Sequence, residues 1–375
     1  MSEWQESALG DFINVKHGYA FKGDEITSEE RAEVLVTPGN FYIGGGFKSG
    51  KFKFFKGNFP QSYVLKENDI VVTMTDLSKE GDTLGYGAKI PKSNGKVFLH
   101  NQRIGLVEFI RGDICKDFLY WILRTAGYQG FVLGAATGTS IRHTSPTTIK
   151  EYKFLRPTLN EQKTIAAVLS SLDDKIDLLH RQNKTLEAMA ETLFRQWFVE
   201  EVQVDWEEGK VEDLFVLQRG YDLPAQNRTD GPYPIYAASG YSGGHSECKV
   251  KGPGVTTGRS GLLGKVFFVL EDFWPLNTSL YVKEFKRGTP LFSYFFLKTL
   301  DLNSYNAGSA VPTLNRNHVH SEKASLPPVD LIKRFEEIAH PLYQKIKQNE
   351  SQVRGLETLR DTLLPKLMSG EVRVV

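Results

Sequence analysis

The residue types and spacings most typical of catalysis occur in this chain only in incomplete form. Residues 258–265 resemble a phosphate-binding loop, but five residues instead of four separate Gly258 from Gly264, and Val266 stands where Ser or Thr would hold magnesium. Pro327-Pro328 is followed by Val329, whereas amino-methyltransferases place an aromatic residue there to stack a flipped base. The sequence therefore predicts neither nucleotide hydrolysis nor methyl transfer by this chain.

Candidate metal ligands and nuclease carboxylates are equally incomplete. His318 and His320 have no third ligand at metal-binding spacing, which favours two loop histidines. Cys115 and Cys248 lie far apart, so neither a disulfide framework nor a thiolate metal site is expected. Carboxylate-x-Lys triplets are expected by chance in a chain with 24% charged residues; they begin at Glu151, Glu161, Glu247 and Glu284. We predict no catalytic residue, no metal and no cofactor.

The remaining pattern consists of Lys, Arg, Asn, Ser and His side chains that could donate hydrogen bonds to nucleic acid. Residues 41–66 contain five lysines, no acidic residue and many aromatics, a composition suited to phosphate contact and base stacking. Lys48, Lys51 and Lys53 are the candidates there, although each could equally be an exposed strand lysine whose stem covers apolar surface. Because Arg reads guanine and Asn reads adenine in the major groove, loops that carry such side chains are further candidates. These are Lys79, Asn101, Arg103, Arg142, His143, Arg228, Arg259, Ser260, Asn277, Asn315, Arg316 and Asn317.

The net charge of +1 excludes a simple nucleic-acid coat protein, which would need a clear excess of Lys and Arg. The charge is unevenly distributed. Residues 1–157 carry 20 basic and 17 acidic side chains, residues 158–204 carry 5 and 8, residues 205–328 carry 13 and 13, and residues 329–375 carry 8 and 7. We expect the chain alone to bind double-stranded DNA weakly, with a modest dependence on salt.

An internal repeat shows which elements must position these side chains. Residues 185–194 align with residues 355–364 at an offset of 170, and residues 11–12 and 18–19 align with residues 213–214 and 220–221 at an offset of 202. Short β-branched and aromatic runs punctuated by glycine precede each helical copy. The predicted fold is α+β, with globular domains at 1–157 and 202–328, each followed by a long helix, at 158–201 and 329–375.

The two helical segments have a coiled-coil pattern. Positions alternately four and three residues apart, from Ile165 to Trp197, are apolar except for Asn183, and the pattern recurs 170 residues later. If the helices pair antiparallel in full overlap, Asn183 faces Asn349, and this polar pair would set the register. Arg360 would then lie opposite Leu172 and would have to bend towards a neighbouring aspartate. The alternative is that each helix packs only on its own domain.

Several large apolar residues lie off this seam, where a two-stranded coil would leave them exposed. They could pack on the adjacent globular domains, or they could form a docking face for helices of another subunit. The residues are Leu178, Phe194, Phe198, Ile338, Leu364 and Met368.

Over essentially its whole length the chain resembles the specificity (S) subunit of type I restriction-modification enzymes. The duplicated order carries the resemblance, together with stretches that are typical of the family. These are Leu84-Gly85, residues 101–105, Glu161-Gln162, residues 256–261, residues 263–266, residues 274–280, Leu326-Pro327-Pro328 and the ending at residues 363–370. The second globular domain is shorter than in longer relatives.

The resemblance implies a division of labour. Each globular domain would be a target recognition domain that reads one half of a split DNA sequence, and the helices would act as a spacer and as a dock for two methyltransferase subunits. Those subunits would carry S-adenosylmethionine, and restriction subunits, which combine a motor with a nuclease, would join them. This chain would then be a non-catalytic subunit without a cofactor of its own.

Two alternatives stay open. A stand-alone two-headed DNA-binding scaffold would bind DNA tightly without a methyltransferase, and a related specificity subunit would serve a partner in which nuclease and methyltransferase are fused.

The sequence also bears on the cellular location of the protein. No apolar run approaches the ~18 residues of a membrane span, and the first residues lack the pattern of a signal segment. We expect a cytoplasmic protein.

Overall fold

The computed structural model describes residues 4–78, 80–138, 141–203, 206–306 and 311–374. It contains two compact units: unit 1 comprises Met1–Asp177 and Arg354–Val375, and unit 2 comprises Leu178–Val353. Each unit holds one globular module and a part of both long helices. The mixed α+β fold predicted from the sequence is confirmed. Lys79 lies outside the described residues. Within the described part of the chain, no helix has both the length and the apolar composition to cross a membrane.

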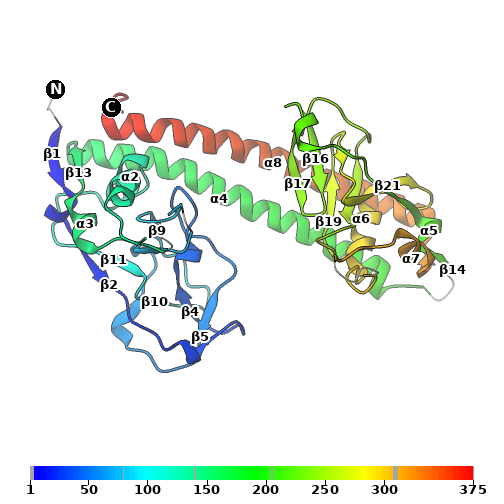
Figure 1. The fold of residues 1–375 in the computed structure, drawn as a ribbon, viewed down its shortest axis with the longest axis horizontal. Coiled ribbons are helices and arrows are strands. Elements are labelled where there is room, and N and C mark those ends of the chain that lie inside the picture. The colour runs from blue at the N-terminus through cyan, green and yellow to red at the C-terminus, as the bar shows by residue number, and fades with distance from the viewer. Residues whose placement is uncertain (1–3, 79, 139–140, 204–205, 307–310, 375) are drawn as a thin grey trace. The chain divides into compact units, whose positions relative to one another are not determined.

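The first module is built mainly from two sheets (Figure 1). Its strands are β1 (Gln5–Ala8), β2 (Ile13–His17), β3 (Ile26–Thr27), β4 (Glu33–Val36), β5 (Lys53–Phe55), β6 (Val64–Leu65), β7 (Ile70–Thr73), β8 (Thr75–Asp76), β9 (Gly87–Lys89), β10 (Val97–His100), β11 (Ile104–Phe109), β12 (Arg142–His143) and β13 (Lys153–Arg156). One sheet has the order β2-β11-β7-β9 and the other β3-β5-β4-β10-β6, while β1 pairs with β13 and β8 with β12. The helices are α1 (Lys116–Ile122), α2 (Ala126–Gly134) and α3 (Pro146–Glu151).

The second module repeats this plan with fewer strands. They are β14 (Glu207–Lys210), β15 (Phe215–Arg219), β16 (Tyr233–Ala237), β17 (Gly240–His245), β18 (Gly254–Gly258), β19 (Val266–Val269), β20 (Trp274–Pro275), β21 (Ser279–Phe285) and β22 (Lys323–Leu326). The sheets have the orders β15-β21-β18-β19 and β17-β16-β20, with a separate β14-β22 pair. The helices are α5 (Val211–Leu214), α6 (Pro290–Thr299) and α7 (Arg316–Ser321).

The repeat in the sequence is therefore a repeat of topology. The order β15-β21-β18-β19 matches β2-β11-β7-β9, and the parallel pair β16–β20 matches β4–β10. Gly18 and Gly220 follow β2 and β15, and a Cβ at either position would lie within 2.3 Å of a backbone carbonyl oxygen, that of Asn101 or of Leu276. The sequence has glycine at both positions because the neighbouring chain passes too close for any side chain.

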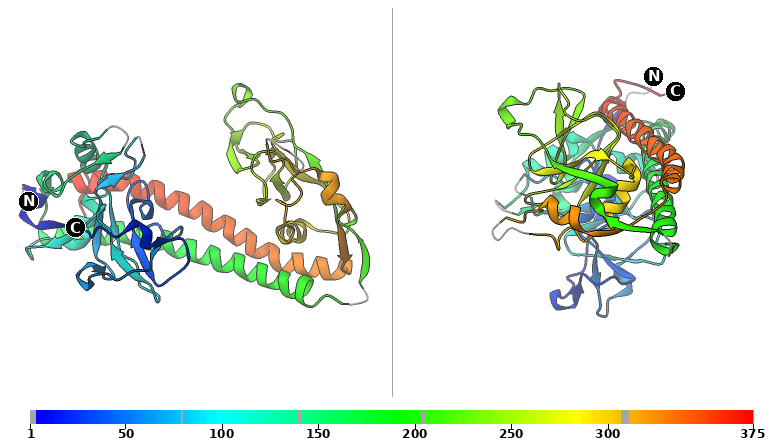
Figure 2. Two further views of the ribbon diagram at one scale, coloured as in Figure 1. Left: turned by 60° about the horizontal axis from the view of Figure 1, so that its bottom comes forward. Right: turned by 90° about the vertical axis from the view of Figure 1, so that its right-hand side faces the viewer.

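Two long helices complete the fold. Helix α4 (Leu159–Arg195) continues into a π-helical turn (Gln196–Glu200), and α8 covers Val329–Ser369. Thr158 and Glu161 form a capping box at the start of α4, because the Glu161 carboxylate accepts from the Thr158 backbone N–H over 3.0 Å and the Thr158 hydroxyl accepts from the Glu161 N–H over 3.4 Å. The two helices lie side by side and antiparallel, which confirms the predicted pairing (Figures 1 and 2).

Contacts within each unit report the helix register. In unit 2, Asn349 Nδ2 donates a hydrogen bond to Asn183 Oδ1 over 2.8 Å, and Asn349 is fully buried. In unit 1, Arg360 Nη1 donates to Asp173 Oδ1 over 2.7 Å, so the guanidinium bends towards the aspartate as expected. The two asparagines therefore meet, and their role in selecting the register stays a prediction.

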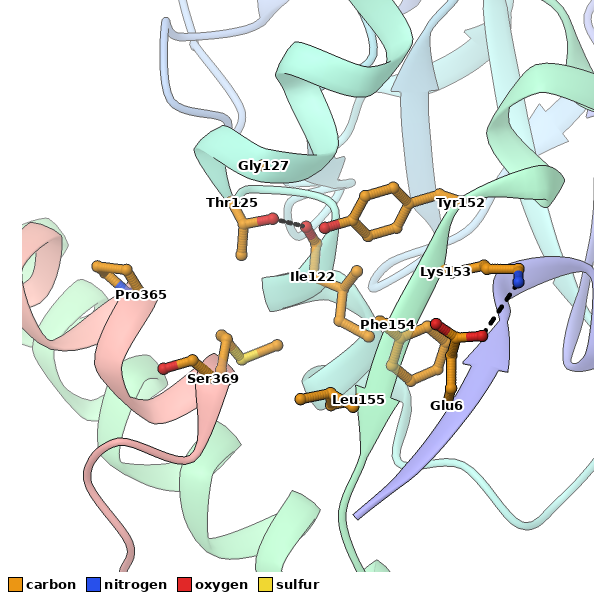
Figure 3. Close-up of a pocket in the computed structure, with 11 residues that line it drawn as sticks. Glu6, Ile122, Thr125, Gly127, Tyr152, Lys153, Phe154, Leu155, Pro365 and Ser369 are labelled. Carbon is orange, nitrogen blue, oxygen red and sulfur yellow. Dashed lines mark hydrogen bonds and ion pairs between the residues drawn. The ribbon is translucent and has the colours of Figure 1, made fainter.

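The core of each unit joins the module to the helices, and this corrects part of the predicted docking face. Phe194 and Phe198 belong to the core of unit 2, and Leu364 belongs to that of unit 1. These three side chains pack on their own modules and are not available to a partner. Met368 is half-buried and lines a pocket of about 370 Å³ between β1, β13, the start of α2 and the end of α8 (Figure 3). Leu178 and Ile338 are exposed.

Candidate nucleic-acid interface

Three loops of unit 2 are held together by backbone hydrogen bonds just beyond the end of β18. The N–H of Arg259 donates to the carbonyl of Thr278 over 2.8 Å, and the carbonyl of Arg259 accepts from the N–H of Leu314 over 2.8 Å. We call residues 259–263, 276–279 and 311–317 the loop cluster of unit 2. It brings together six predicted site residues from distant parts of the sequence: Arg259, Ser260, Asn277, Asn315, Arg316 and Asn317.

The side chains of this cluster differ in how freely they can reach a ligand. The Arg259 guanidinium is half-buried and donates through Nη1 to the Asn277 carbonyl over 3.3 Å. The Asn277 amide is bonded to the Asp222 carboxylate. Asn315 caps α7, since its side-chain oxygen accepts from the backbone N–H of Asn317 over 3.0 Å. Arg316 and Asn317 are exposed on the first turn of that helix and are the freest donors of the set.

Unit 1 has the same arrangement. The N–H of Met74 donates to the carbonyl of Arg103 over 2.9 Å, and the carbonyl of Met74 accepts from the N–H of Thr144 over 3.0 Å. Strand β12 then pairs with β8, with Arg142 opposite Asp76. We call residues 74–78, 101–104 and 141–145 the loop cluster of unit 1. The corresponding pairs in the two units are Met74 with Arg259, Arg103 with Thr278, and Thr144 with Leu314.

Among the site residues predicted in unit 1, Arg103 and His143 are exposed and Arg142 is half-buried. His143 Nδ1 lies 3.1 Å from the Thr75 hydroxyl, which holds the ring against β8. The structure gives no support to Asn101 as a DNA contact, because the residue is only 6% exposed and its Oδ1 accepts from the Arg103 N–H over 3.1 Å. Asn101 instead shapes the turn that presents Arg103.

Asp76 is a residue of this cluster that sequence reasoning missed. Its carboxylate accepts hydrogen bonds from the N–H of Ser78 over 2.7 Å and from the N–H and hydroxyl of Thr83, both over 2.6 Å. Burial alone would raise the pKa of the Asp76 carboxyl, but these hydrogen bonds lower it below its usual value. The ionised carboxylate therefore ties the loop after β8 back onto itself. The Asp-x-Ser spacing, typical of an Asx turn, is the signal that could have identified it.

The remaining candidates lie elsewhere in their modules. Lys48, Lys51 and Lys53 are exposed near or on β5, and the Lys48 ammonium lies 5.8 Å from the centre of the Tyr42 ring. Arg228 is half-buried and donates weakly to Ser242 over 3.4 Å. In the part of the chain that the structure describes, no hydrogen bond or ion pair joins these four side chains to the loop clusters.

The chain is similar to known proteins in sequence and in fold. The family profile described as type I restriction modification DNA specificity domain matches residues 1–188 and 203–354. The type I restriction enzyme MjaIX specificity subunit of Methanocaldococcus jannaschii is 22% identical over 310 residues, which cover 70% of this chain and 71% of that protein. The EcoBI specificity subunit of Escherichia coli is 21% identical, over 98% of this chain and 86% of that protein. The crystal structure of a type I restriction-modification S subunit from M. genitalium has the same fold, with a TM-score of 0.64, 19% identity, and coverage of 97% and 96% of the two chains.

Proposed function

This chain belongs to the family of DNA specificity subunits of type I restriction-modification systems, which is non-catalytic, and on this premise we propose that each of its two modules reads one half of a bipartite DNA target. The observation that carries the proposal is the pair of corresponding loop clusters. Their backbone hydrogen bonds are the same, but their side chains differ. One framework with two sets of donors suits two half-sites of different sequence, and hence an asymmetric target.

The chemistry of the exposed and half-buried donors supports contact with double-stranded DNA. Arg103, Arg142 and His143 would reach base edges or phosphates of one half-site, and Arg259, Arg316 and Asn317 those of the other. Lys48, Lys51 and Lys53 are exposed and would contact phosphates outside the loop cluster of unit 1. With a net charge of +1, the chain needs partner subunits to supply much of the phosphate neutralisation.

The helices would set the unread spacer between the half-sites. In this proposal residues 1–157 and 202–328 are the target recognition domains, and residues 158–201 and 329–375 form the coil between them. Helix α4 has 37 residues and is therefore about 55 Å long at ~1.5 Å per residue. This length exceeds one DNA turn, ~34–36 Å, which is the distance expected between the centres of two half-sites on one face of the duplex. The hydrogen bond between Asn349 and Asn183 would hold the coil in one register.

The same coil would dock two methyltransferase subunits, which carry S-adenosylmethionine and transfer the methyl group, and through them the restriction subunits. Exposed apolar residues at corresponding helix positions, Met189 and Leu359, support two like docking positions. Leu178 lines an apolar groove of about 440 Å³ on the helix pair of unit 2. Ile338 is 43% exposed elsewhere on α8 and would be a separate apolar contact.

The decisive experiment maps methylated adenines in cells with and without this chain. We expect methylation at one bipartite sequence that disappears when the chain is removed. A stand-alone scaffold would instead bind DNA tightly by itself, and adding methyltransferase would bring no gain. Co-purification also identifies the partner, because a fused nuclease-methyltransferase would appear as a single additional chain.

A matched deletion tests the spacer. Facing seam positions sum to 532, so removal of residues 176–182 together with residues 350–356 takes one heptad from each helix and keeps Asn183 opposite Asn349. The coil then shortens by about 10 Å, which corresponds to up to about three base pairs. The mapped spacer should shorten, whereas an unchanged methylation site would refute the spacer model.

A further inference from the structure

Each loop cluster exposes a pair of large aliphatic side chains that the proposed base contacts do not use. In unit 1 they are Leu77, 58% exposed, and Ile141, 41% exposed. In unit 2 they are Leu262, 42% exposed, and Val311, 53% exposed. Isolated exposed aliphatics are common, but paired ones at the edge of a polar loop cluster call for a ligand.

The two pairs occupy the same place in the two modules. In unit 1 the antiparallel register pairs Thr75 with His143 and Asp76 with Arg142, and Leu77 and Ile141 are the residues that directly adjoin this short ladder on its two segments. In unit 2 Ser260 pairs with Thr313 and the Gly261 N–H donates to the Pro312 carbonyl over 2.9 Å, and Leu262 and Val311 are the residues that come next on the two segments. Each pair therefore adjoins the end of its ladder in the sequence.

The aliphatic pair recurs in both modules although the loops that carry it differ greatly in length and sequence. From the end of β7 to β9, 13 residues separate Thr73 from Gly87, whereas 7 residues separate the corresponding Gly258 from Val266. Loop length and most side chains have diverged between the two copies, yet both keep an exposed aliphatic pair next to the ladder. Both pairs would gain free energy from burial against a ligand.

The surroundings of the pairs favour nucleic acid as that ligand. In unit 1 the neighbours across the ladder are Arg142 and His143, the carboxylate of Asp76 is turned back onto Ser78 and Thr83, and the acidic side chains of the loop beyond Leu77 are Glu80 and Asp82. In unit 2 the segment from Arg259 to Lys265 contains two cations and no acidic residue. Aliphatic side chains beside cationic donors match a duplex, whose phosphates are anionic and whose base faces are apolar.

We propose that Leu77 with Ile141, and Leu262 with Val311, are wedges that insert against the base stack at an opened base-pair step, one in each half-site. Each pair offers two branched aliphatic side chains, which is more apolar surface than contact with one thymine methyl needs. Branched aliphatic wedges unstack such steps and kink the duplex. This inference rests on the proposed function.

The test uses the complex of the full chain with its methyltransferase, and a duplex that carries the methylated sequence found by mapping. 2-Aminopurine, which brightens when it unstacks, replaces one base at a time across each half-site except at the methylated adenine and its partner base, because the methyltransferase flips its target adenine out of the stack whether or not a wedge is present. With the double variant Leu77→Ala/Ile141→Ala, the 2-aminopurine fluorescence at the bright position of the first half-site should fall to its value in the free duplex, while the fluorescence in the second half-site is unchanged. Leu262→Ala/Val311→Ala should give the reverse. Affinity should fall by about tenfold in each case.

Matched variants control for a general loss of apolar surface. Ile110 is 59% exposed and Val329 is 37% exposed, and both lie outside the loop clusters, so Ile110→Ala and Val329→Ala should leave both signals unchanged. A duplex with a mismatch at the bright step is already unstacked and should restore the affinity of the wedge variants. Because a misfolded variant would not be rescued in this way, rescue separates a wedge from a folding defect.

Other outcomes overturn the inference. An unchanged 2-aminopurine signal in a variant that still binds would exclude a wedge. Loss of binding reproduced by replacing thymine with deoxyuridine would assign the pairs to thymine methyl contacts, and loss of co-purified methyltransferase would assign them to a protein interface. Failure of the proposed function itself would be recognised earlier, because the wild-type complex would then show no specific binding.

Discussion

In unit 1 an ion group adds to the apolar core that joins the globular module to the long helices, whereas in unit 2 the corresponding helix positions carry aromatic and small apolar side chains. Asp173 of α4 corresponds to Tyr343 of α8 at the offset of 170, and Arg360 of α8 corresponds to Ala190 of α4. Asp173 and Arg360 form an ion pair in unit 1, whereas Tyr343 and Ala190 belong to the core of unit 2.

The charged contact of unit 1 centres on Arg124, whose side chain is only 4% exposed. Its guanidinium donates to the Asp173 carboxylate, to the Gly44 carbonyl over 2.9 Å and to the Tyr120 hydroxyl over 3.1 Å. Asp173 also accepts from Arg360 over 2.7 Å, so one carboxylate connects the module with both helices. Each of these contacts depends on direction as well as distance.

The contact of unit 2 is an aromatic cluster. The Phe194 ring stacks on Phe295 of α6 with 5.4 Å between centroids, and it meets Phe335 of α8 edge-on at 5.6 Å. Phe198 packs against the same two helices through Phe292 and Phe335. The same helix positions therefore accept either kind of contact. An aromatic contact needs side chains of matching volume, whereas the ion group needs each charged partner in place.

The largest expected effect is the loss of a ring from the aromatic cluster. Phe194→Ala should destabilise unit 2 by about 4 kcal/mol, because it leaves a cavity among Phe295, Phe335 and their neighbours. The matched variant in unit 1 is Leu364→Ala, at the corresponding helix position, with an expected cost of about 3 kcal/mol. Amide hydrogen exchange, read separately over β10–β11 and β20–β21, shows which unit opens. Equal loss of protection in both units would contradict independent anchoring.

The next effect distinguishes the ionic anchor from the aromatic one. Asp173→Ala should destabilise unit 1 by about 3 kcal/mol, since it leaves the buried Arg124 guanidinium without its counter-charge. The triple variant Arg124→Met/Asp173→Leu/Arg360→Leu should recover most of that loss, because an apolar group of similar volume can replace a buried ion group. Denaturant unfolding monitored by the same exchange probes measures both. If the single and triple variants were equally unstable, the ion group would be needed for more than its charge balance.

The sequence predicted the helical part of the molecule better than the modules. Helix periodicity is local, so the seam, the antiparallel pairing and the approach of Arg360 to Asp173 all followed from spacing. Strand order depends on pairings between distant residues, and the burial of Phe194 and Phe198 depends on where α6 lies, which no local pattern contains. Loop donors such as Arg259 were chosen by residue type, and their contact with DNA stays a prediction. Residue type could not show that Asn101 is buried, because a buried turn asparagine has the same sequence context as an exposed one.

The smallest of the three effects comes from a difference between the modules in a titratable group. His100 ends β10 in unit 1, and Pro275 ends β20 in unit 2. The two positions correspond, because the carbonyl of His100 accepts from the backbone N–H of Tyr19 and that of Pro275 from the backbone N–H of Tyr221, each over 2.8 Å. Burial lowers the pKa of the His100 imidazole to about 4, although its hydrogen bond to the Ile104 carbonyl acts in the opposite direction. Lys16 and His17 lower the pKa further, and Asp69 raises it.

Acidification should therefore weaken unit 1 through His100 and leave the corresponding site of unit 2 unaffected. The unfolded chain binds a proton at His100 below about pH 6.5, whereas the folded unit does not until about pH 4, so stability falls as the pH drops through this window. Between pH 7.5 and pH 5 the loss amounts to about 2 kcal/mol. His100→Gln keeps an N–H that can reach the Ile104 carbonyl but cannot titrate, and its unit 1 should lose less exchange protection on acidification than the wild type does. Identical pH profiles for the two proteins would show that His100 is solvated in the native state.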